Sequence, residues 1–406
     1  MTARKGNRLG KLLIVYEEFN PTEEIVIGAL KEAQKRGVFE ITARKCAQVT
    51  ASDLSWADSV FVIRGHLWLT AQLLKRAKRM NRFCVAYWDD DYSDLMPGLV
   101  LSPAREHAFR EILRLSDVIV SPNPLLAEKL AKTVGGKRTA VFDTIVRPTD
   151  GADAPKEPED TGLVRMVYAA GVGHTLFFDE IIRPVLPALS ERFGGRLSLT
   201  FVGVHPDMEG FSEPLSVTYV DHIPLKEFRA LMRDGGFDFG IAPLTEGGFF
   251  QYKYFNKFLE YSVAGIPAIY SDCVPYTLVV EQGINGLLSE NTPEGWLAAI
   301  TRMVEDKSLR EALRAGAKQT MRRRFSPEGV IERLLTAVPE LRAFESPKGK
   351  APLLIFLRIG HVFNRLSDYG FYTMLRLKEG GVINTCKRIV SHVQVRAQAK
   401  KSEKQI

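Results

Sequence analysis

The chain alternates short apolar runs with longer amphipathic runs, and this alternation occurs twice. In the first series, Ser59–Ile63 has the length and composition of a buried strand, and Pro21–Arg36 has the spacing of an amphipathic helix with Asn20 as its N-cap. Strands that alternate with helices form right-handed βαβ units around a parallel sheet. The pattern therefore predicts an α/β protein.

The expected elements form two series of similar design that are not sequence repeats. The first series has strands at Leu12–Tyr16, Phe39–Ala43, Ser59–Ile63, Arg82–Trp88, Asp117–Val120 and Arg138–Phe142, with helices at Pro21–Arg36, Leu67–Met80, Glu106–Leu115 and Pro124–Lys132. The second has strands at Val164–Ala169, Leu197–Val202, Val217–Val220, Phe237–Ala242, Pro267–Tyr270 and Gly286–Leu288, with helices at Phe177–Arg192, Leu225–Asp234, Lys253–Ala264, Thr292–Val304, Ser308–Arg322 and Ser326–Ala337.

A proline-rich segment separates the two series. Residues 147–160 contain three prolines and no aromatic residue, a composition typical of a linker. We expect a Rossmann-like domain over 1–146, a linker over 147–162, a second Rossmann-like domain over 163–325, and a helix over 326–345 that crosses back to the first domain. Ligands bind open α/β sheets at the carboxyl ends of their strands, so two such domains predict a central cleft.

The positive charge of the chain is confined to its last residues. The net charge is +7, but residues 346–406 carry 12 Lys and Arg against 3 Asp and Glu, and the rest has a net charge of −2. A near-neutral body with a basic tail does not favour a nucleic-acid partner.

Other classes of protein are also disfavoured. No run approaches the roughly 18–20 apolar residues of a membrane span, and the apolar run near the N-terminus is short enough to be a first strand rather than a signal peptide. The four cysteines lie far apart without a CxxC pair. A reduced, cytosolic protein without a structural zinc site is therefore the simplest interpretation.

One block in the second half could bind a nucleotide diphosphate. A buried strand ends near Ala242, a loop with Gly247 and Gly248 follows, and a helix is expected from Lys253. The peptide N–H groups of a helix start favour an anion. Lys253 and Lys257, expected on one helix face, could add positive charge, and the Glu260 carboxylate could bind ribose or sugar hydroxyls. The alternative is an exposed helix with an ordinary Lys–Glu pair.

The same block resembles a known family. Lys257-Phe-Leu-Glu-Tyr-Ser-Val-Ala-Gly-Ile-Pro267 is similar to the donor-site signature of GT-B glycosyltransferases, in particular the group-1 (family four) enzymes, and Glu281-Gln-Gly-Ile-Asn-Gly286 resembles a second element of that signature. The resemblance covers residues 160–330 in sequence and 1–150 in architecture alone.

The resemblance implies roles for several residues of the second domain. Glu260 would bind the ribose of a sugar nucleotide, and the diphosphate would lie on backbone amides near Phe255, Asn256 and Lys257, with the Lys253 or Lys257 ammonium assisting. The remaining donor-binding residues would be the glycine-rich turn at Gly171, Gly173 and His174, and Gly203 and Ile223 around the base.

The sequence also departs from the family pattern. The family pairs two Glu residues, but Tyr252 stands eight residues before Glu260, and the nearest upstream acid is Glu246, which we take as a candidate catalytic residue. His174 stands where the family has Arg and Lys. The resemblance implies retention of anomeric configuration, and these departures affect that catalytic detail rather than the donor pocket.

Three acids follow the fourth expected strand. Asp89-Asp90-Asp91 could hold Mn²⁺ or Mg²⁺ as a DxD motif, could bind an acceptor and act as a general base, or could be a solvated turn. Adjacent carboxylates raise the pKa of one another, which suits a base. We take Asp90 and Asp91 as candidate catalytic residues and expect no metal and no cofactor.

A histidine follows the third expected strand. His66, in Arg64-Gly65-His66, could orient the acceptor or the donor sugar, or could be an ordinary loop residue. No GxGxxG, GxSxG, Walker A or HExxH pattern is present, so the first half does not read as an NAD site.

The basic tail predicts an amphipathic helix. Leu354, Leu357, Ile359, Val362, Phe363 and Leu366 form an apolar stripe. Such a segment, over residues 351–401, could bind an anionic membrane surface, or it could pack back on the first domain.

We therefore expect a metal-independent glycosyltransferase that moves a sugar from a nucleotide diphosphate to a glycan or lipid-linked acceptor at the cytoplasmic membrane face, in cell-surface polysaccharide or glycolipid assembly. The alternatives are a sugar-nucleotide epimerase of similar fold and a degenerate, glycosyltransferase-like scaffold.

Overall fold

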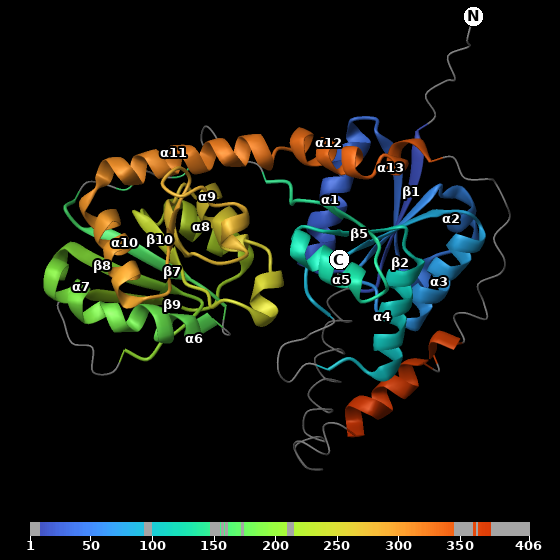
Figure 1. The fold of residues 1–406 in the computed structure, drawn as a ribbon, viewed down its shortest axis with the longest axis horizontal. Coiled ribbons are helices and arrows are strands. Elements are labelled where there is room, and N and C mark those ends of the chain that lie inside the picture. Colours follow the sequence, from blue (N-terminus) through green and yellow to red (C-terminus); the bar gives the residue numbers. More distant parts are fainter. Residues whose placement is uncertain are drawn as a thin grey trace, which may run out of the picture.

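The computed structural model describes residues 9–92, 100–146, 155, 158, 161–171, 174–208, 215–344, 360–362 and 364–374. Two α/β domains make up most of it, and long helices connect them along one side (Figure 1). The predicted linker, apart from Pro155, Pro158, Thr161 and Gly162, lies outside the described residues.

The N-terminal domain is a six-stranded parallel sheet in the order β2-β1-β3-β4-β5-β6. Its strands are β1 (Gly10–Tyr16), β2 (Phe39–Lys45), β3 (Ser59–Ile63), β4 (Phe83–Tyr87), β5 (Val118–Ser121) and β6 (Arg138–Val141). Its helices are α1 (Pro21–Lys35), α2 (Ala51–Trp56), α3 (Trp68–Arg79), α4 (Pro103–Leu115) and α5 (Pro124–Lys132). Every residue of β3 and β4 is buried, as expected for central strands covered on both faces.

The C-terminal domain repeats this plan with a six-stranded parallel sheet in the order β12-β11-β10-β7-β8-β9. Its strands are β7 (Val164–Ala169), β8 (Leu197–Val202), β9 (Ser216–Val220), β10 (Phe239–Ala242), β11 (Ala268–Ser271) and β12 (Leu287–Ser289). Its helices are α6 (Thr175–Phe177), α7 (Leu186–Phe193), α8 (Leu225–Asp234), α9 (Asn256–Val263), α10 (Pro293–Glu305) and α11 (Lys307–Arg324), and η7 (Gly248–Tyr252) is a 3₁₀ segment.

The chain passes back to the N-terminal domain through its last long helices. α12 (Pro327–Ala337) and α13 (Glu340–Ala343) follow α11, and Val330 and Leu334 of α12 enter the hydrophobic core on one face of the N-terminal sheet. The two crossings between the domains touch, because the Val146 amide donates to the Phe325 carbonyl at 2.9 Å.

One predicted helix is interrupted. Instead of a continuous helix over Phe177–Arg192, the structure has α6, a π-helical turn (Phe178–Ile182), a 3₁₀ turn (Arg183–Val185) and then α7. Pro184 and Pro187 explain the break, because proline cannot donate to the carbonyl four residues before it.

A second correction concerns the start of α9. The helix begins at Asn256 and not at Lys253, because residues 248–252 form the 3₁₀ turn η7, which starts at the two positive-φ residues Gly247 (its N-cap) and Gly248. Lys253 has extended backbone angles, so it does not share a helix face with Lys257.

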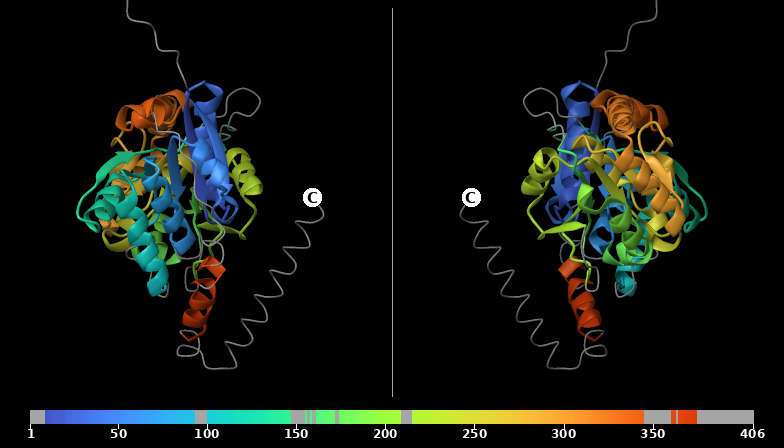
Figure 2. Two further views of the ribbon diagram at one scale, coloured as in Figure 1. Left: turned by 90° about the vertical axis from the view of Figure 1, so that its right-hand side faces the viewer. Right: turned by 90° about the vertical axis from the view of Figure 1, so that its left-hand side faces the viewer.

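A helix over 360–362 and 364–374 lies beside α4 and projects beyond the two domains (Figures 1 and 2). The first part of the predicted apolar stripe, through Ile359, and Phe363 lie outside the described residues. Among the helices that the structure describes, none is both long and apolar enough to span a bilayer.

Candidate functional site

Each sheet has one switch point, the place where successive strands change from one side of the sheet to the other. Most of the predicted site residues lie near these two points. In the N-terminal sheet, the chain runs outward from β1 on one side and from β3 on the other. In the C-terminal sheet, β7 and β10 are the corresponding neighbours. Loops that leave the carboxyl ends of such strands diverge and leave space for a ligand. Most of the predicted residues follow β3, β4, β7 or β10, whereas Gly203 follows β8 and Ile223 follows β9.

The C-terminal switch point gathers cationic side chains. Lys253, after β10, has a pKa lowered by burial, and the opposite charge of Asp90 in the N-terminal domain partly restores it. Its ammonium lies 5.2 and 5.4 Å from the ring centres of Phe249 and Phe250. A half-buried cation held on aromatic faces is available to an anionic ligand.

His174 lies at the same place, after β7. Burial, together with the neighbouring charges of Lys253 and Lys257, lowers the pKa of His174 to about 4. The imidazole is therefore neutral at physiological pH. Although Lys253 lies outside α9, the fold brings it and Lys257 to the same histidine.

Lys257 and Glu260 form an ion pair on α9 at 2.6 Å. Both side chains are partly exposed, so each can exchange its partner for a ligand. Of the predicted diphosphate-binding amides, that of Asn256 already donates to the Tyr254 carbonyl at 2.9 Å. Phe255 as a whole is only 1% exposed, and its ring packs against that of Tyr254.

The remaining donor-side residues follow neighbouring strands. Gly203 has a φ of +79°, and a Cβ there would lie 2.7 Å from the Ala170 carbonyl oxygen, so only glycine fits. Ile223 is half-buried beyond β9, and Gly171 is exposed, with its carbonyl accepting from the His174 amide at 2.9 Å. Gly173 lies outside the described residues.

Glu246 is exposed in the loop after β10. Burial raises the pKa of the Cys273 thiol to about 12, and the charge of Glu246 adds to this rise. Glu246 therefore lies on the Cys273 side of the loop.

In the N-terminal domain, one guanidinium binds two of the three consecutive acids. Arg64 makes an ion pair with Asp89 and another with Asp90 at 2.7 Å, and Thr22 donates to Asp89 at 2.8 Å. Burial and the Asp89 charge raise the pKa of Asp90, whereas Arg64 and Lys253 lower it. Arg64 has a φ of +48°, an uncommon conformation for a residue other than glycine.

Asp91 is oriented differently from its neighbours. Its side chain is fully buried and pairs with Lys129 of α5 at 2.6 Å. The Lys129 ammonium also lies 4.3 Å from the ring centre of Tyr252, across the domain interface. Asp91 thus supports the contact between α5 and η7.

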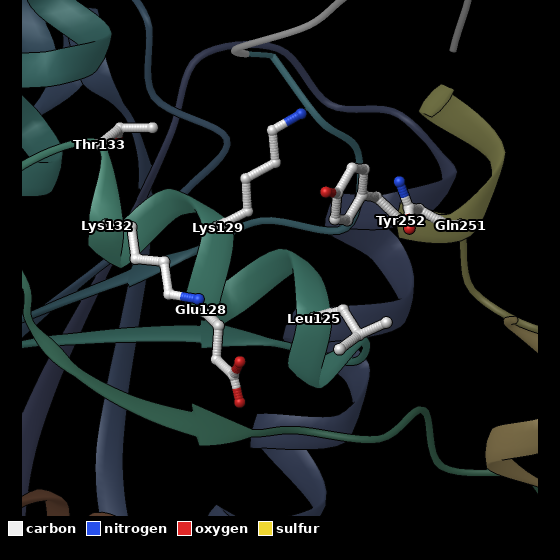
Figure 3. Close-up of a pocket in the computed structure, with 7 residues that line it drawn as sticks. All are labelled: Leu125, Glu128, Lys129, Lys132, Thr133, Gln251 and Tyr252. Atoms are coloured by element: carbon white, nitrogen blue, oxygen red, sulfur yellow. The ribbon is translucent and has the colours of Figure 1, made fainter. Parts of the chain in front are cut away.

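A pocket of about 360 Å³ opens at this interface (Figure 3). It is lined by Leu125, Glu128, Lys129, Lys132, Thr133, Gln251 and Tyr252. None of the predicted site residues lines it, so it lies beside the cluster of His174, Lys253 and Asp90 and not within it.

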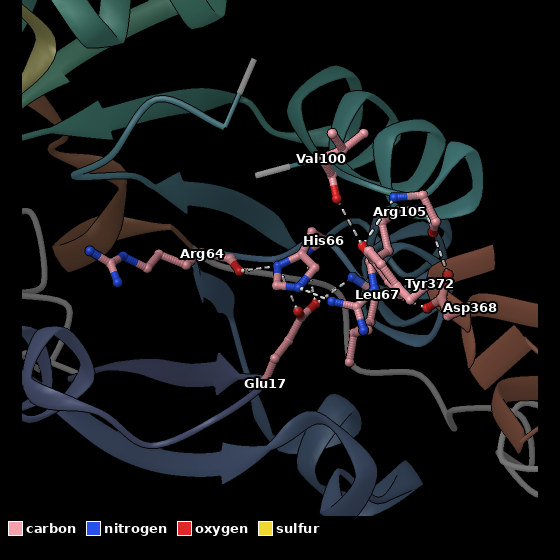
Figure 4. Close-up of polar contacts among 9 residues, drawn as sticks. Glu17, Arg64, His66, Leu67, Val100, Arg105, Asp368 and Tyr372 are labelled. Carbon is pink, nitrogen blue, oxygen red and sulfur yellow. Dashed lines mark hydrogen bonds and ion pairs between the residues drawn. The ribbon is translucent and has the colours of Figure 1, made fainter. Parts of the chain in front are cut away.

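His66 lies at the N-terminal switch point in a polar network that sequence reasoning missed (Figure 4). Glu17, buried at the end of β1, accepts from the amides of His66 (2.9 Å) and Leu67 (2.7 Å). The two His66 ring nitrogens lie 3.2 Å from Glu17 Oε2 and 3.0 Å from Arg105 Nη1. The only local sequence signal for Glu17 is its place directly after a strand, and Arg105 has no such signal.

Asn123 is a second residue that sequence reasoning missed. It is the N-cap of α5, where its Oδ1 accepts from the Leu125 amide at 2.9 Å. Its Nδ2 donates across the interface to the carbonyls of Gln251 (2.9 Å) and Lys253 (2.8 Å). An asparagine before proline after a strand signals a cap, but nothing local signals the contact with the other domain.

The described residues contain no group of three or more His, Cys, Asp or Glu side chains arranged to hold a metal ion. Three of the four cysteines, Cys46, Cys84 and Cys273, are buried free thiols.

No family model matches this chain, and no curated protein matches its sequence. Solved structures do match its fold. HepE of Anabaena, solved with UDP and glucose, is 14% identical with a TM-score of 0.56, over 82% of this chain and 100% of that one. The lipopolysaccharide outer core galactosyltransferase WaaB, in its apo form, is 13% identical with a TM-score of 0.53, over 81% and 99%.

Sucrose-phosphate synthase from Thermosynechococcus elongatus is 12% identical with a TM-score of 0.54, over 82% of this chain and 99% of that one. These similarities extend over nearly the whole length of each neighbour, and both domains contribute to them. They confirm the predicted fold: the chain has the two-domain GT-B architecture, with two Rossmann-like domains.

Proposed function

We propose that the protein is a glycosyltransferase that takes a sugar from a nucleotide diphosphate. The observation that carries this proposal is the cluster of His174, Lys253 and Lys257 at the C-terminal switch point, with Glu260 beside it. Neighbours of the same fold were solved with UDP or a sugar, and one is a galactosyltransferase, which supports the same chemistry here.

The leaving diphosphate would be stabilised by the lysine ammonium groups and by the N-terminus of α9. The helix and lysines supply positive charge without a metal ion. The three consecutive acids support a metal-independent reaction, because Arg64 binds Asp89 and Asp90 and Lys129 binds Asp91. Asp90 faces Lys253 across the domains, so we propose that it binds the acceptor or receives its proton.

The test measures thermal stabilisation by a panel of nucleotide sugars, followed by product analysis. A donor that binds raises the melting temperature as mass action requires. Transfer of the sugar to an added acceptor supports the proposal. A changed sugar nucleotide without any acceptor would show an epimerase, and no stabilisation by any donor would leave the scaffold as the better description.

We further propose that the protein works on the cytoplasmic face of a membrane, on a glycan or lipid-linked acceptor of the cell surface. Val362, Leu366 and Tyr369 lie at helical spacing and are each more than half exposed on the helix over 360–374. The surrounding tail, residues 346–406, carries a net charge of +9. An exposed apolar stripe in a basic segment is typical of an interfacial helix.

Co-sedimentation with vesicles tests this placement. We expect binding to rise when phosphatidylserine is added to phosphatidylcholine, and the V362E/L366E double variant to bind less. Ser367 and Gly370 are exposed outside the stripe, so S367E/G370E is the matched control for two added negative charges. Equal loss in both would assign the effect to charge alone, and no loss in either would exclude the stripe.

A further inference from the structure

The C-terminal helix over 360–374 is docked on the N-terminal domain through polar contacts that reach His66. Asp368 is buried, makes a hydrogen bond with Ser102, and accepts from Arg105 Nε at 2.9 Å. Tyr372 accepts from the Ser102 amide at 3.1 Å. Its hydroxyl also lies 3.1 Å from the Val100 carbonyl, to which it donates (Figure 4).

The docked and exposed faces of this helix differ in character. Asp368 and Tyr372 are one turn apart and face α4, whereas the apolar Val362 and Leu366 point away from the domain. A helix held by hydrophobic burial would show the opposite arrangement. The polar contacts of this helix therefore hold Asp368 against Arg105.

Arg105 connects Asp368 to His66. Its Nε binds Asp368, and its Nη1 lies 3.0 Å from His66 Nε2. A guanidinium can only donate, so His66 Nε2 has to accept, which leaves the ring proton on Nδ1. The tautomer is thus determined by the arginine.

The other side of the ring agrees with this assignment. His66 Nδ1 lies 3.2 Å from Glu17 Oε2, a buried carboxylate oxygen that makes no hydrogen bond within the described part of the chain. The Arg64 carbonyl oxygen also lies 3.3 Å from Nδ1. A proton on Nδ1 faces both acceptors, and a proton on Nε2 would face the guanidinium instead.

We propose that Asp368 and Arg105 are positioning residues for His66, so that the C-terminal helix is a working part of the N-terminal half of the site. Docked, the helix holds Arg105 on Nε2 and so fixes both the orientation and the tautomer of the imidazole. Arg105 is thus the partner of His66, and only the sugar-transfer measurements rest on the proposed function.

The experiment records imidazole nitrogen shifts of His66 in the full chain. We expect the Nδ1–H tautomer in the unaltered protein and in S367A, whose change lies at an exposed position next to Asp368. D368N keeps the volume but exchanges one acceptor oxygen for a donor, and we expect the Nε2–H tautomer to appear in it. D368E retains the carboxylate and should restore the original spectrum.

Kinetics supply the second readout. We expect D368N to lower kcat about tenfold or more with the KM for the nucleotide sugar unchanged, because the helix contacts the N-terminal half of the site. Circular dichroism separates this effect from unfolding. An unaltered His66 tautomer in D368N would overturn the proposal, whereas absence of transfer activity in the unaltered protein, with the tautomer shift in D368N intact, would count against the proposed function alone.

Discussion

The Asn123 side-chain amide donates to the Lys253 carbonyl at 2.8 Å. A residue of the N-terminal domain therefore holds the loop of the C-terminal domain that carries the Lys253 ammonium. The same asparagine caps α5 through its Oδ1. One side chain therefore fixes a helix start and the position of Lys253.

Two variants of Asn123 separate these roles. Asp is as good an N-cap as Asn but cannot donate to the Gln251 and Lys253 carbonyls, so N123D keeps the cap while its buried carboxylate faces two carbonyl oxygens and weakens the interface. N123A removes both contacts and should also cost about 1 kcal/mol of helix capping. Urea unfolding measures stability, and calorimetry measures nucleotide affinity. If N123D binds the nucleotide as tightly as the unaltered protein, Asn123 does not position the Lys253 loop for nucleotide binding.

Glu260 is expected to bind ribose. E260A should weaken UDP binding at least tenfold, which is about 1.4 kcal/mol, and E311A, an exposed change on α11, is the control. Because Glu260 also pairs with Lys257, the variant frees a cation that could favour phosphate. A double-mutant cycle that combines E260A with 2′-deoxy-UDP separates the two effects. Removal of the 2′-hydroxyl should lower the affinity of the unaltered protein but not that of E260A. Equal losses in both would place the ribose elsewhere.

His174 makes stability depend on pH. Its pKa is lowered to about 4 in the folded chain from 6.5, so the unfolded chain binds more protons as the pH falls. The folded state should therefore lose on the order of 1–3 kcal/mol between pH 6.5 and 4 through this residue, and nothing above that range. H174Q should flatten this part of the profile in urea titrations. H205Q, at an exposed histidine, should not.

The same shift predicts proton uptake on nucleotide binding. A diphosphate beside His174 favours the charged imidazole and raises its pKa. Affinity should then increase as the pH falls from 7 towards 5, and calorimetry in buffers of different ionisation enthalpy should detect the uptake. H174Q should remove it. Proton uptake unaltered in H174Q would show that another group titrates.

Asp143 connects both domains near their crossings. Its side chain is buried and accepts from Tyr254 (3.1 Å), Arg324 (3.3 Å) and Arg333 (3.2 Å). D143N removes the charge of a buried acceptor from the partly exposed Arg324 and the exposed Arg333, and should cost about 2–3 kcal/mol in urea unfolding. Y254F loses the bond that the hydroxyl donates to Asp143 and the one that it accepts from the Thr144 amide, but leaves the Asp143 charge in place, and should cost about 1 kcal/mol. Similar costs would mean that the charge of Asp143 contributes little.

Local signals predicted most elements because these depend on nearby residues. The N-cap Asn20 and the apolar period placed α1, and continuous apolar runs placed β3 and β4. The short helix α2 was missed, although Thr50 and Asp53 form a capping box that the sequence displays. The predicted continuous helix after β7 ignored its two prolines.

Long-range contacts could not be predicted in the same way. The Arg64 contacts with Asp89 and Asp90 join residues 25 and 26 positions apart, and the Asp368 contact with Arg105 joins residues 263 apart. Nothing in either local sequence specifies such a partner. The position of His174 near Lys253 follows from strand order, which a list of strands leaves undetermined.

The hydrogen bond between Val146 and Phe325 sets the geometry of any relative motion of the domains. It ties the two crossings of the chain at one point, so a rotation of one domain against the other has its pivot there. Displacement grows with distance from a pivot. Asp143 and Tyr254, which join the domains beside it, should move least, while the side chains that meet farther away, among them Lys129 and Tyr252, should separate first.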